Sequence, residues 1–146
     1  MTYTETKMDL FSKENDAELL HCISSDFALG AGIAKQFAAR EIKKKLQTTY
    51  LANCWSGHGY ALRTGHVWNL VTKERYFHKP TYQTIEEALE DCLRQLLVEM
   101  PENIRPTIAL PKIGCGLDRL EWEKVRPIIQ RVFADTDFAI CVCEYP

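Results

Sequence analysis

The chain alternates short apolar segments with longer segments whose apolar residues recur every three or four positions. The short apolar segments have the length of buried strands and lie at residues 17–23, 107–110 and 138–143. The helical spacing occurs over residues 33–46, 85–96 and 125–133. Strands therefore alternate with helices through the second half of the chain, which predicts an α/β fold with a mixed central β-sheet and helices on both faces.

Local signals refine the middle of the chain. Residues 60–62 and 67–71 flank Arg63-Thr64-Gly65-His66, which predicts a hairpin whose second strand delivers Lys73 to a strand end. After Pro80, Thr84 and Glu87 have the spacing of a capping box, which predicts the start of the helix that ends before Pro101. An apolar pair at Leu10-Phe11 precedes the first strand.

Composition indicates one ordinary globular domain over residues 1–146. The hydrophobic and charged fractions are 46% and 26%, and the net charge of −2 gives no broad positive field that would attract a nucleic-acid backbone. The lysines at 43–45 are therefore interpreted as a solvated helix face, although a nucleic-acid patch is the alternative. The sequence shows no leader peptide and no membrane-spanning run, so we expect a cytoplasmic monomer, or a nuclear one in a eukaryotic host.

The six cysteines are expected to be reduced, because no secretory signal accompanies them. There is no C-x-x-C pair, and Cys141 and Cys143 lie two apart on a strand without a second pair of ligands. The sequence therefore predicts no metal site and no cofactor.

Two glycine-rich loops carry the strongest candidate chemistry. Each follows a strand and precedes a helix, at Gly30-Ala31-Gly32 and at Gly114-Cys115-Gly116. Glycines let backbone N–H groups approach a phosphate, and the N-terminus of a helix favours negative charge, so two such loops suit a pyrophosphate. Neither loop matches the dinucleotide or P-loop fingerprints. Two tight turns that need positive φ are the alternative.

In order along the chain, several segments resemble the macrodomain family, in particular its terminal ADP-ribose protein glycohydrolase branch. They are His21-Cys22-Ile23-Ser24, Gly30-Ala31-Gly32-Ile33-Ala34, Leu70-Val71-Thr72-Lys73, His78-Lys79-Pro80-Thr81-Tyr82 and Pro111 to Trp122. The resemblance covers most of the chain and implies a macrodomain fold that binds ADP-ribose and ADP-ribosylated protein.

The resemblance assigns two catalytic residues. It makes Lys73 the nucleophile, whose amine attacks the anomeric carbon of the distal ribose and leaves a transient covalent adduct, with Lys79 as a local competitor. It makes Asp118 the group that moves protons and helps to resolve the adduct. A helix N-cap is the alternative for Asp118, because Glu121 follows three residues later.

Further residues are expected to bind ADP-ribose. Asp9 retains part of the family's adenine-contacting motif, with Met8 in place of its usual glycine, and Tyr145 is placed to cover the adenine ring. Cys115 could alternatively be a thiolate nucleophile at a helix N-terminus, and His21 a structural histidine. The predicted ligand contacts are Asp9, Leu10, His21, Ser24, Gly30, Ala31, Gly32, Ile33, Ala34, Thr72, Pro111, Ile113, Gly114, Cys115, Gly116, Leu117 and Tyr145.

The expected function is removal of a single ADP-ribose from an acceptor, with the ester of an acidic side chain as the preferred acceptor. A reader module that binds ADP-ribose without chemistry is the main competing hypothesis. A phosphatase of ADP-ribose 1″-phosphate, a deacetylase of O-acetyl-ADP-ribose and a hydrolase of ADP-ribosylated DNA are three further candidates. The sequence does not separate these acceptors.

Overall fold

The computed structural model describes residues 1–101 and 104–145, and these form one six-stranded sheet with helices on both faces. In sheet order the strands are β1 (Thr2–Lys7), β6 (Ala139–Glu144), β5 (Thr107–Leu110), β2 (Glu18–Ser24), β4 (Val67–Lys73) and β3 (Tyr60–Thr64). All neighbours are parallel except β3 and β4, which form an antiparallel hairpin. The expected mixed α/β sheet is confirmed.

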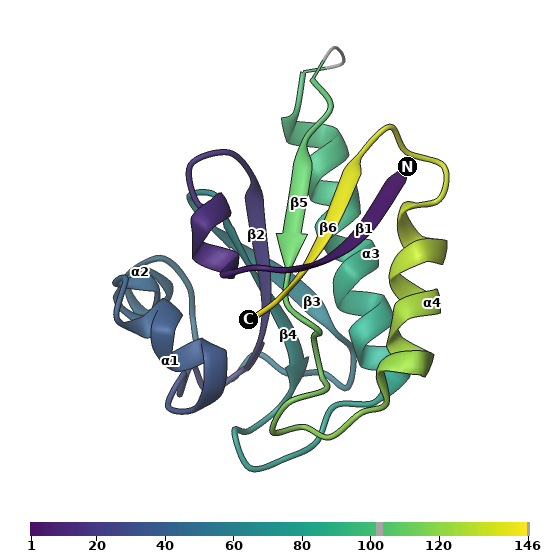
Figure 1. The fold of residues 1–146 in the computed structure, drawn as a ribbon. Helices are drawn as coiled ribbons and strands as arrows, with labels where there is room; N and C mark the ends of the chain where they lie inside the picture. The colour runs from purple at the N-terminus through teal and green to yellow at the C-terminus, as the bar shows by residue number, and fades with distance from the viewer. Residues whose placement is uncertain (102–103, 146) are drawn as a thin grey trace.

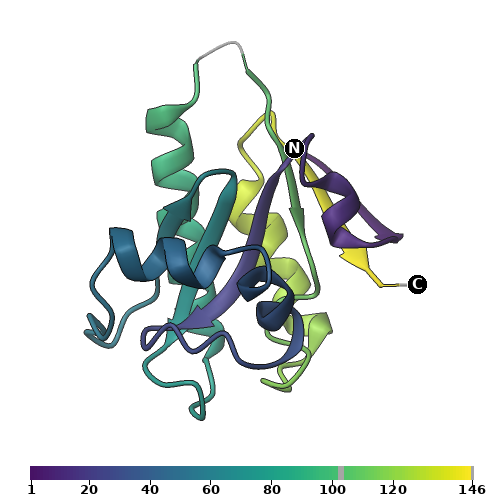
Figure 2. The ribbon, with the colours of Figure 1, turned by 90° about the vertical axis from the view of Figure 1, so that its left-hand side faces the viewer.

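The helices lie in two layers (Figure 1). On one face are α1 (Gly32–Ala38), α2 (Ile42–Thr49) and the 3-10 helix η1 (Leu10–Lys13), and on the other are α3 (Tyr82–Glu99) and α4 (Trp122–Phe133). The turned view places η1 beside the C-terminal strand (Figure 2). No helix of the described residues is long and apolar enough to cross a membrane.

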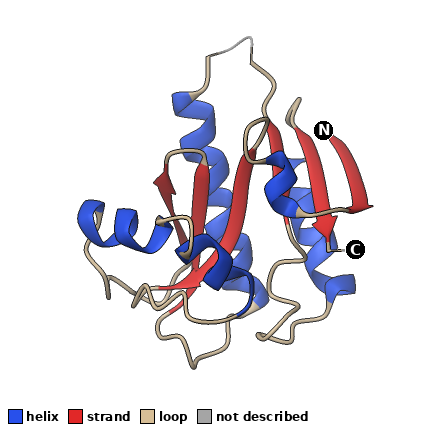
Figure 3. Cartoon of the chain, turned by 60° about the vertical axis from the view of Figure 1, so that its left-hand side comes forward, coloured by secondary structure: helices blue, strands red, loops and turns tan. Residues whose placement is uncertain are grey.

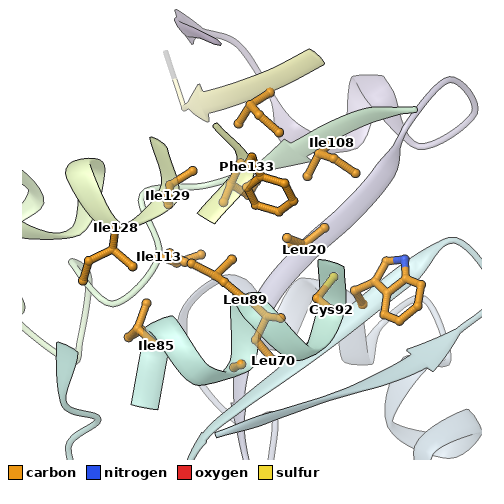
Figure 4. Packing of buried hydrophobic residues seen from close by; sticks show 14 of the residues in the cluster. Leu20, Leu70, Ile85, Leu89, Cys92, Ile108, Ile113, Ile128, Ile129 and Phe133 are labelled. Carbon is orange, nitrogen blue, oxygen red and sulfur yellow. The ribbon is translucent and has the colours of Figure 1, made fainter. Parts of the chain in front are cut away.

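Alternation along the strands divides the core into two clusters. In β4, Leu70 faces the cluster beneath α3 and α4, whereas Val71 faces the cluster beneath α1 and α2. Figure 4 shows the first cluster, in which Leu89 of α3 and Phe133 of α4 pack over the strands. Burial on both faces explains why the central strands appear in the sequence as nearly continuous apolar runs.

Three details differ from the sequence-based predictions. The helix predicted over residues 33–46 is two helices, because Glu41 adopts a left-handed conformation with φ of 66° between α1 and α2. The break keeps the stripe intact, since Phe37, Ile42 and Leu46 all remain buried in one cluster. The edge strand β1 was also not predicted, because most of its residues are exposed and carry no apolar pattern.

The third difference is the cap of α3. The capping box joins Thr81 and Thr84, each side chain accepting a hydrogen bond from the other's backbone N–H, so the box predicted for Thr84 and Glu87 is wrong. Glu87 instead accepts a hydrogen bond of 3.0 Å from the backbone N–H of Gly59. The helix therefore starts three residues earlier than that spacing implied and follows Pro80 almost directly.

Candidate functional site

The loops after β2, β4 and β5 gather at the C-terminal ends of the parallel strands (Figure 3). Residues of these loops line a cleft. Its first cavity has a volume of about 590 Å³ and is walled by both glycine-rich loops. The residues lining it are Cys22, Ile23, Ser24, Ala28, Leu29, Gly30, Ala31, Gly32, Ile33, Ala34, Lys73, Tyr76, Pro111, Lys112, Ile113, Gly114, Gly116, Leu117 and Asp118. This is the edge at which open α/β sheets bind ligands.

A second cavity, of about 340 Å³, continues the first. The two share Ile33, Pro111, Lys112 and Gly116, so they form a single elongated cleft. The second cavity is lined by Asp9, Leu10, Phe11, Ile33, Gln36, Pro111, Lys112, Cys115, Gly116, Cys143, Glu144 and Tyr145. An extended ligand with two ends of different chemistry fits this shape.

The first glycine-rich loop leads directly into a helix. Between β2 and α1 the backbone is left-handed at Phe27 and Leu29, with φ of 57° and 44°, and again at Gly32, with φ of 60°. Left-handed conformations at two side-chain-bearing residues are unfavourable, and the buried positions of Phe27 and Leu29 in the core hold them there. The loop is therefore fixed from below while Gly30 and Ala31 remain exposed at the cleft.

The second glycine-rich loop is built from consecutive turns. Cys115 donates its backbone N–H to the Lys112 carbonyl at 3.2 Å, and Leu120 donates to the Gly114 carbonyl at 2.7 Å. The helix α4 begins at Trp122, so each glycine-rich loop precedes a helix as predicted, but the first leads into its helix directly and the second does so only after further turns.

Lys73 and Asp118 meet in the wall of the first cavity. The Lys73 Nζ donates to Asp118 Oδ1 at 2.7 Å, and the two side chains are only 13% and 18% exposed. The strand β4 positions the lysine at its last residue, and the turns of the second loop position the aspartate. An ion pair this sheltered from solvent is a candidate for proton transfer.

The competing interpretations of these two residues are not supported. The N-cap of α4 is Glu121, so Asp118 is not the helix cap, and its carboxylate is free to face Lys73. Lys79 is exposed and lines neither cavity of the cleft. The geometry therefore favours Lys73 over Lys79 as the cleft lysine.

All predicted site residues except His21 and Thr72 line one of the two cavities. His21 is fully buried and stacks on Phe37 with ring centroids 3.8 Å apart, while its Nε2 lies 2.6 Å from Asn69 Oδ1. Burial lowers the pKa of His21 to about 4, against the opposing effect of the Asn69 hydrogen bond. The structural interpretation of this histidine therefore fits its position beneath α1.

Thr72 also lies outside the cleft, in the wall of a different cavity. Strand alternation explains this, because Thr72 faces the same side of the sheet as Leu70, under α3. Ser24 does line the first cavity, and its hydroxyl donates to Asp26.

In the second cavity, Asp9 caps η1 by accepting a hydrogen bond of 3.0 Å from the Phe11 backbone N–H. Tyr145 is 75% exposed at the rim. Burial raises the pKa of the Cys115 thiol, and the nearby Lys112 only partly opposes this, so a thiolate nucleophile is disfavoured there.

Asp26, which the sequence analysis did not single out, helps to hold the loops around the first cavity although it lines neither cavity itself. Its carboxylate accepts hydrogen bonds from the Ser24 hydroxyl, from the Ala28 N–H at 3.1 Å and from the Tyr76 N–H at 2.9 Å. It thereby ties the loop after β4 to the first glycine-rich loop. A polar residue directly after a buried strand was the available signal, but its partner Tyr76 is fifty residues away.

None of the described residues forms a group of three or more His, Cys, Asp or Glu side chains able to hold a metal ion. All six cysteines are free thiols. The Cys141 and Cys143 sulfurs lie 3.8 Å apart, as expected for residues two apart on one strand face.

Comparison with known proteins finds a matching family model and similar named proteins. The Macro domain family model matches residues 15–129. The chain is 40% identical over 144 residues to "ADP-ribose glycohydrolase OARD1" of Bos taurus, covering 95% of this chain and 89% of the relative, and 39% identical to the protein of that name from Homo sapiens over the same shares.

Solved structures agree on the fold. The macrodomain of Mycobacterium tuberculosis DarG has a TM-score of 0.74 at 23% identity and covers 99% of this chain and 98% of its own. Thermosipho africanus DarTG, solved in complex with ADP-ribose, has a TM-score of 0.67 at 18% identity over 97% of this chain and 41% of its own. Together with the matched family model and the 40% identical relative, these likenesses show that this chain belongs to the Macro domain family.

Proposed function

We propose that this protein is an ADP-ribose glycohydrolase that removes mono-ADP-ribose from the ester of an acidic side chain, with Lys73 and Asp118 as its catalytic residues. The observation that carries the proposal is the 2.7 Å contact between the Lys73 Nζ and Asp118 Oδ1 in the wall of the cleft. The 40% identity to a named ADP-ribose glycohydrolase supports the hydrolase activity.

The cleft suits the two halves of ADP-ribose. The adenosine half is assigned to the second cavity, beside Asp9 and Tyr145, and the distal ribose to the first, beside Lys73. The pyrophosphate then lies between the loops, where the exposed glycines leave backbone N–H groups accessible. We also propose that the protein acts as a monomer, since this chain itself supplies both glycine-rich loops, Lys73 and Asp118.

The contact between Lys73 and Asp118 supports a reaction in which the lysine is the nucleophile. Transfer of one Nζ proton to the Asp118 carboxylate leaves a free amine, which forms a bond to the anomeric carbon as the bond from that carbon to the acceptor oxygen breaks. The acceptor leaves as a carboxylate. Water then resolves the lysine adduct with Asp118 moving the protons, and ADP-ribose and the free lysine are released.

The test is release of free ADP-ribose from a protein mono-ADP-ribosylated on glutamate, followed by mass spectrometry. Lys73→Ala and Asp118→Ala should each lower kcat by at least about 100-fold, the usual contribution of one positioned proton-transfer group. Lys44→Ala, an exposed lysine of α2, is the matched control and should keep wild-type activity. Reductive trapping of the adduct followed by peptide mapping should place the sugar on Lys73 and not on Lys79.

A folded wild type that binds ADP-ribose but releases none from the ester would contradict the hydrolase and favour a reader. Release of inorganic phosphate from ADP-ribose 1″-phosphate at a higher rate than release of ADP-ribose from protein would favour the phosphatase. Equal loss of activity in Lys44→Ala would show that the Lys73 effect is not specific.

A further inference from the structure

A third cavity, of about 400 Å³, lies on the other side of the β4 end from the cleft. It shares one residue, Lys73, with the first cavity, and neither Asp118 nor a glycine-rich loop borders it. The residues that line it include Thr72, Lys73, Glu74, Lys79, Thr81 and Gln83. The three cavities therefore follow one another across the strand ends, with Lys73 at the boundary between the first and the third.

Thr72, one of the residues that line the third cavity, has a buried hydroxyl with no hydrogen-bond partner within residues 1–101 and 104–145. Thr72 is 1% exposed, and its Oγ1 makes no hydrogen bond of ordinary geometry there. The Cys22 thiol interacts with it from the adjacent strand, but a thiol is a weak partner. A buried hydroxyl without an ordinary hydrogen bond is unfavourable, so the polar groups at the end of β4 are not fully satisfied by the fold alone.

The opposite wall is the N-terminus of an eighteen-residue helix, α3, toward which strand alternation turns Thr72. Thr81 is the N-cap of α3, and its hydroxyl satisfies only the backbone N–H of Thr84, so amides of the first turn remain available. Lys79, which precedes the helix, is exposed and adds a positive charge. The helix end and the lysine together favour a negatively charged group in this cavity.

We propose that the third cavity is the acceptor site of the enzyme and binds the acidic peptide segment that carries the ADP-ribosylated side chain. This inference rests on the proposed function, because Lys73 marks the position of the bond that is cleaved. The acceptor departs as a carboxylate, and Lys79 and the α3 N-terminus stabilise that charge. Glu74 also borders the cavity, and its negative charge disfavours a nucleic-acid backbone, which carries a negative charge on every phosphate.

The experiment measures binding in the Asp118→Ala protein, so that it does not depend on turnover. Isothermal titration compares free ADP-ribose with a peptide mono-ADP-ribosylated on glutamate and flanked by acidic residues. The ADP-ribosylated peptide should bind more tightly than ADP-ribose, and adding Lys79→Glu should weaken its binding by about tenfold while leaving free ADP-ribose within twofold. Gln83→Ala should weaken the peptide by a smaller factor.

Lys44→Glu is the control for charge reversal at an exposed helix lysine and should change neither affinity. Lys79 and Gln83 are both exposed, so neither variant should affect folding. Equal affinity of the Asp118→Ala protein for peptide and free ADP-ribose, or no selective effect of Lys79→Glu, would overturn the acceptor site. A selective effect on an ADP-ribosylated DNA oligonucleotide instead of the peptide would also overturn it.

The same variants distinguish this inference from the function it rests on. If the protein with Asp118 intact releases no ADP-ribose but the peptide still binds selectively through Lys79, the hydrolase proposal fails and the acceptor site stands as part of a reader. If ADP-ribose is released but the binding selectivity is missing, only the acceptor site fails.

Discussion

The two glycine-rich loops look alike in the sequence, yet the structure uses their glycines in opposite order. In the first loop, Gly30 has ordinary surroundings, whereas Gly32 needs a left-handed backbone. In the second loop, Gly114 needs a left-handed backbone with φ of 74°, and Gly116 has nothing within 4 Å of the place where a Cβ would stand. Each loop therefore contains one glycine required by the backbone and one that leaves space at the cleft.

The two kinds of glycine therefore have different roles. One is required for the backbone to fold, and the other leaves space in which a ligand could approach the backbone. A β-carbon at Gly116 costs the folded protein little, because no protein atom would meet it. The openness at Gly30 and Gly116 is thus not required by the fold, and it is what the proposed close approach of phosphate oxygens to the backbone would need. Stability and ligand affinity should consequently respond to different glycines.

Gly116→Glu should give the largest effect. A carboxylate beside the proposed pyrophosphate position places like charges together, which costs several kcal/mol, so ADP-ribose affinity should fall by about a thousandfold. The midpoint of urea unfolding should stay close to wild type. Isothermal titration measures the affinity, and Gly116→Gln, with similar bulk and no charge, separates crowding from repulsion. Unchanged affinity in Gly116→Glu would show that the phosphates do not lie along this loop.

His21 is buried beneath α1, the helix that follows the first loop, and its contribution to stability should depend on pH. It stacks on Phe37 of that helix, and Asn69 fixes its Nε2 proton. Asn69 uses its own amide to donate to Leu62 and Thr64, which leaves its oxygen to accept from His21. The Nδ1 atom of His21 carries no proton in this tautomer and has no partner among the described residues. Protonation of Nδ1 would therefore bury an unpaired charge.

The folded-state pKa of His21, about 4, lies below the ordinary value of 6.5, so the unfolded chain binds more protons between these values. Stability should therefore fall as the pH drops from about 6.5 to 4, by up to about 3 kcal/mol from this residue. Urea unfolding at a series of pH values should show this slope in the wild type and its loss in His21→Gln. The exposed His58→Gln serves as the control and should retain the slope.

Periodicity was sufficient for the core of the fold. The central strands and α3 and α4 were predicted because their burial produces apolar runs and stripes that can be recognised locally. The break at Glu41 and the edge strand β1 were missed, because a left-handed residue without glycine and an exposed strand leave no local signal.

The functional site likewise contains residues that were predicted from the sequence and residues that were not. The family resemblance selected residues that line the cleft, whereas the positions of His21 and Thr72 depend on which face of a strand turns toward the cavity. Asp26 was missed because its contact with Tyr76 crosses between two loops far apart in sequence. Tertiary contacts of this kind cannot be deduced from spacing alone.

Gly114→Ala should lower the stability of the fold, whereas Gly116→Glu should lower ADP-ribose affinity and leave stability close to wild type. A Cβ there would lie 2.9 Å from Leu120 Cδ1 on a backbone with positive φ. The leucine end can rotate away, so most of the cost is backbone strain, and the free energy of unfolding should fall by about 2 kcal/mol. Urea unfolding checks this value. Leu120→Ala combined with Gly114→Ala removes the contact but not the strain, so full rescue in the double variant would contradict the strain explanation.

Of the two variants that strain the backbone, Gly32→Ala should have the smaller effect on stability. The backbone at Gly32 is left-handed, with φ of 60°, but a Cβ would meet only Leu117 Cδ1 at an ordinary 3.5 Å. The strain of about 1 kcal/mol is partly offset because alanine restricts the unfolded chain more than glycine does. Urea unfolding should therefore show a smaller loss than in Gly114→Ala, with ADP-ribose affinity reduced only a few-fold. A loss larger than that of Gly114→Ala would mean that the first loop, which runs directly into α1, tolerates less adjustment than the turns of the second.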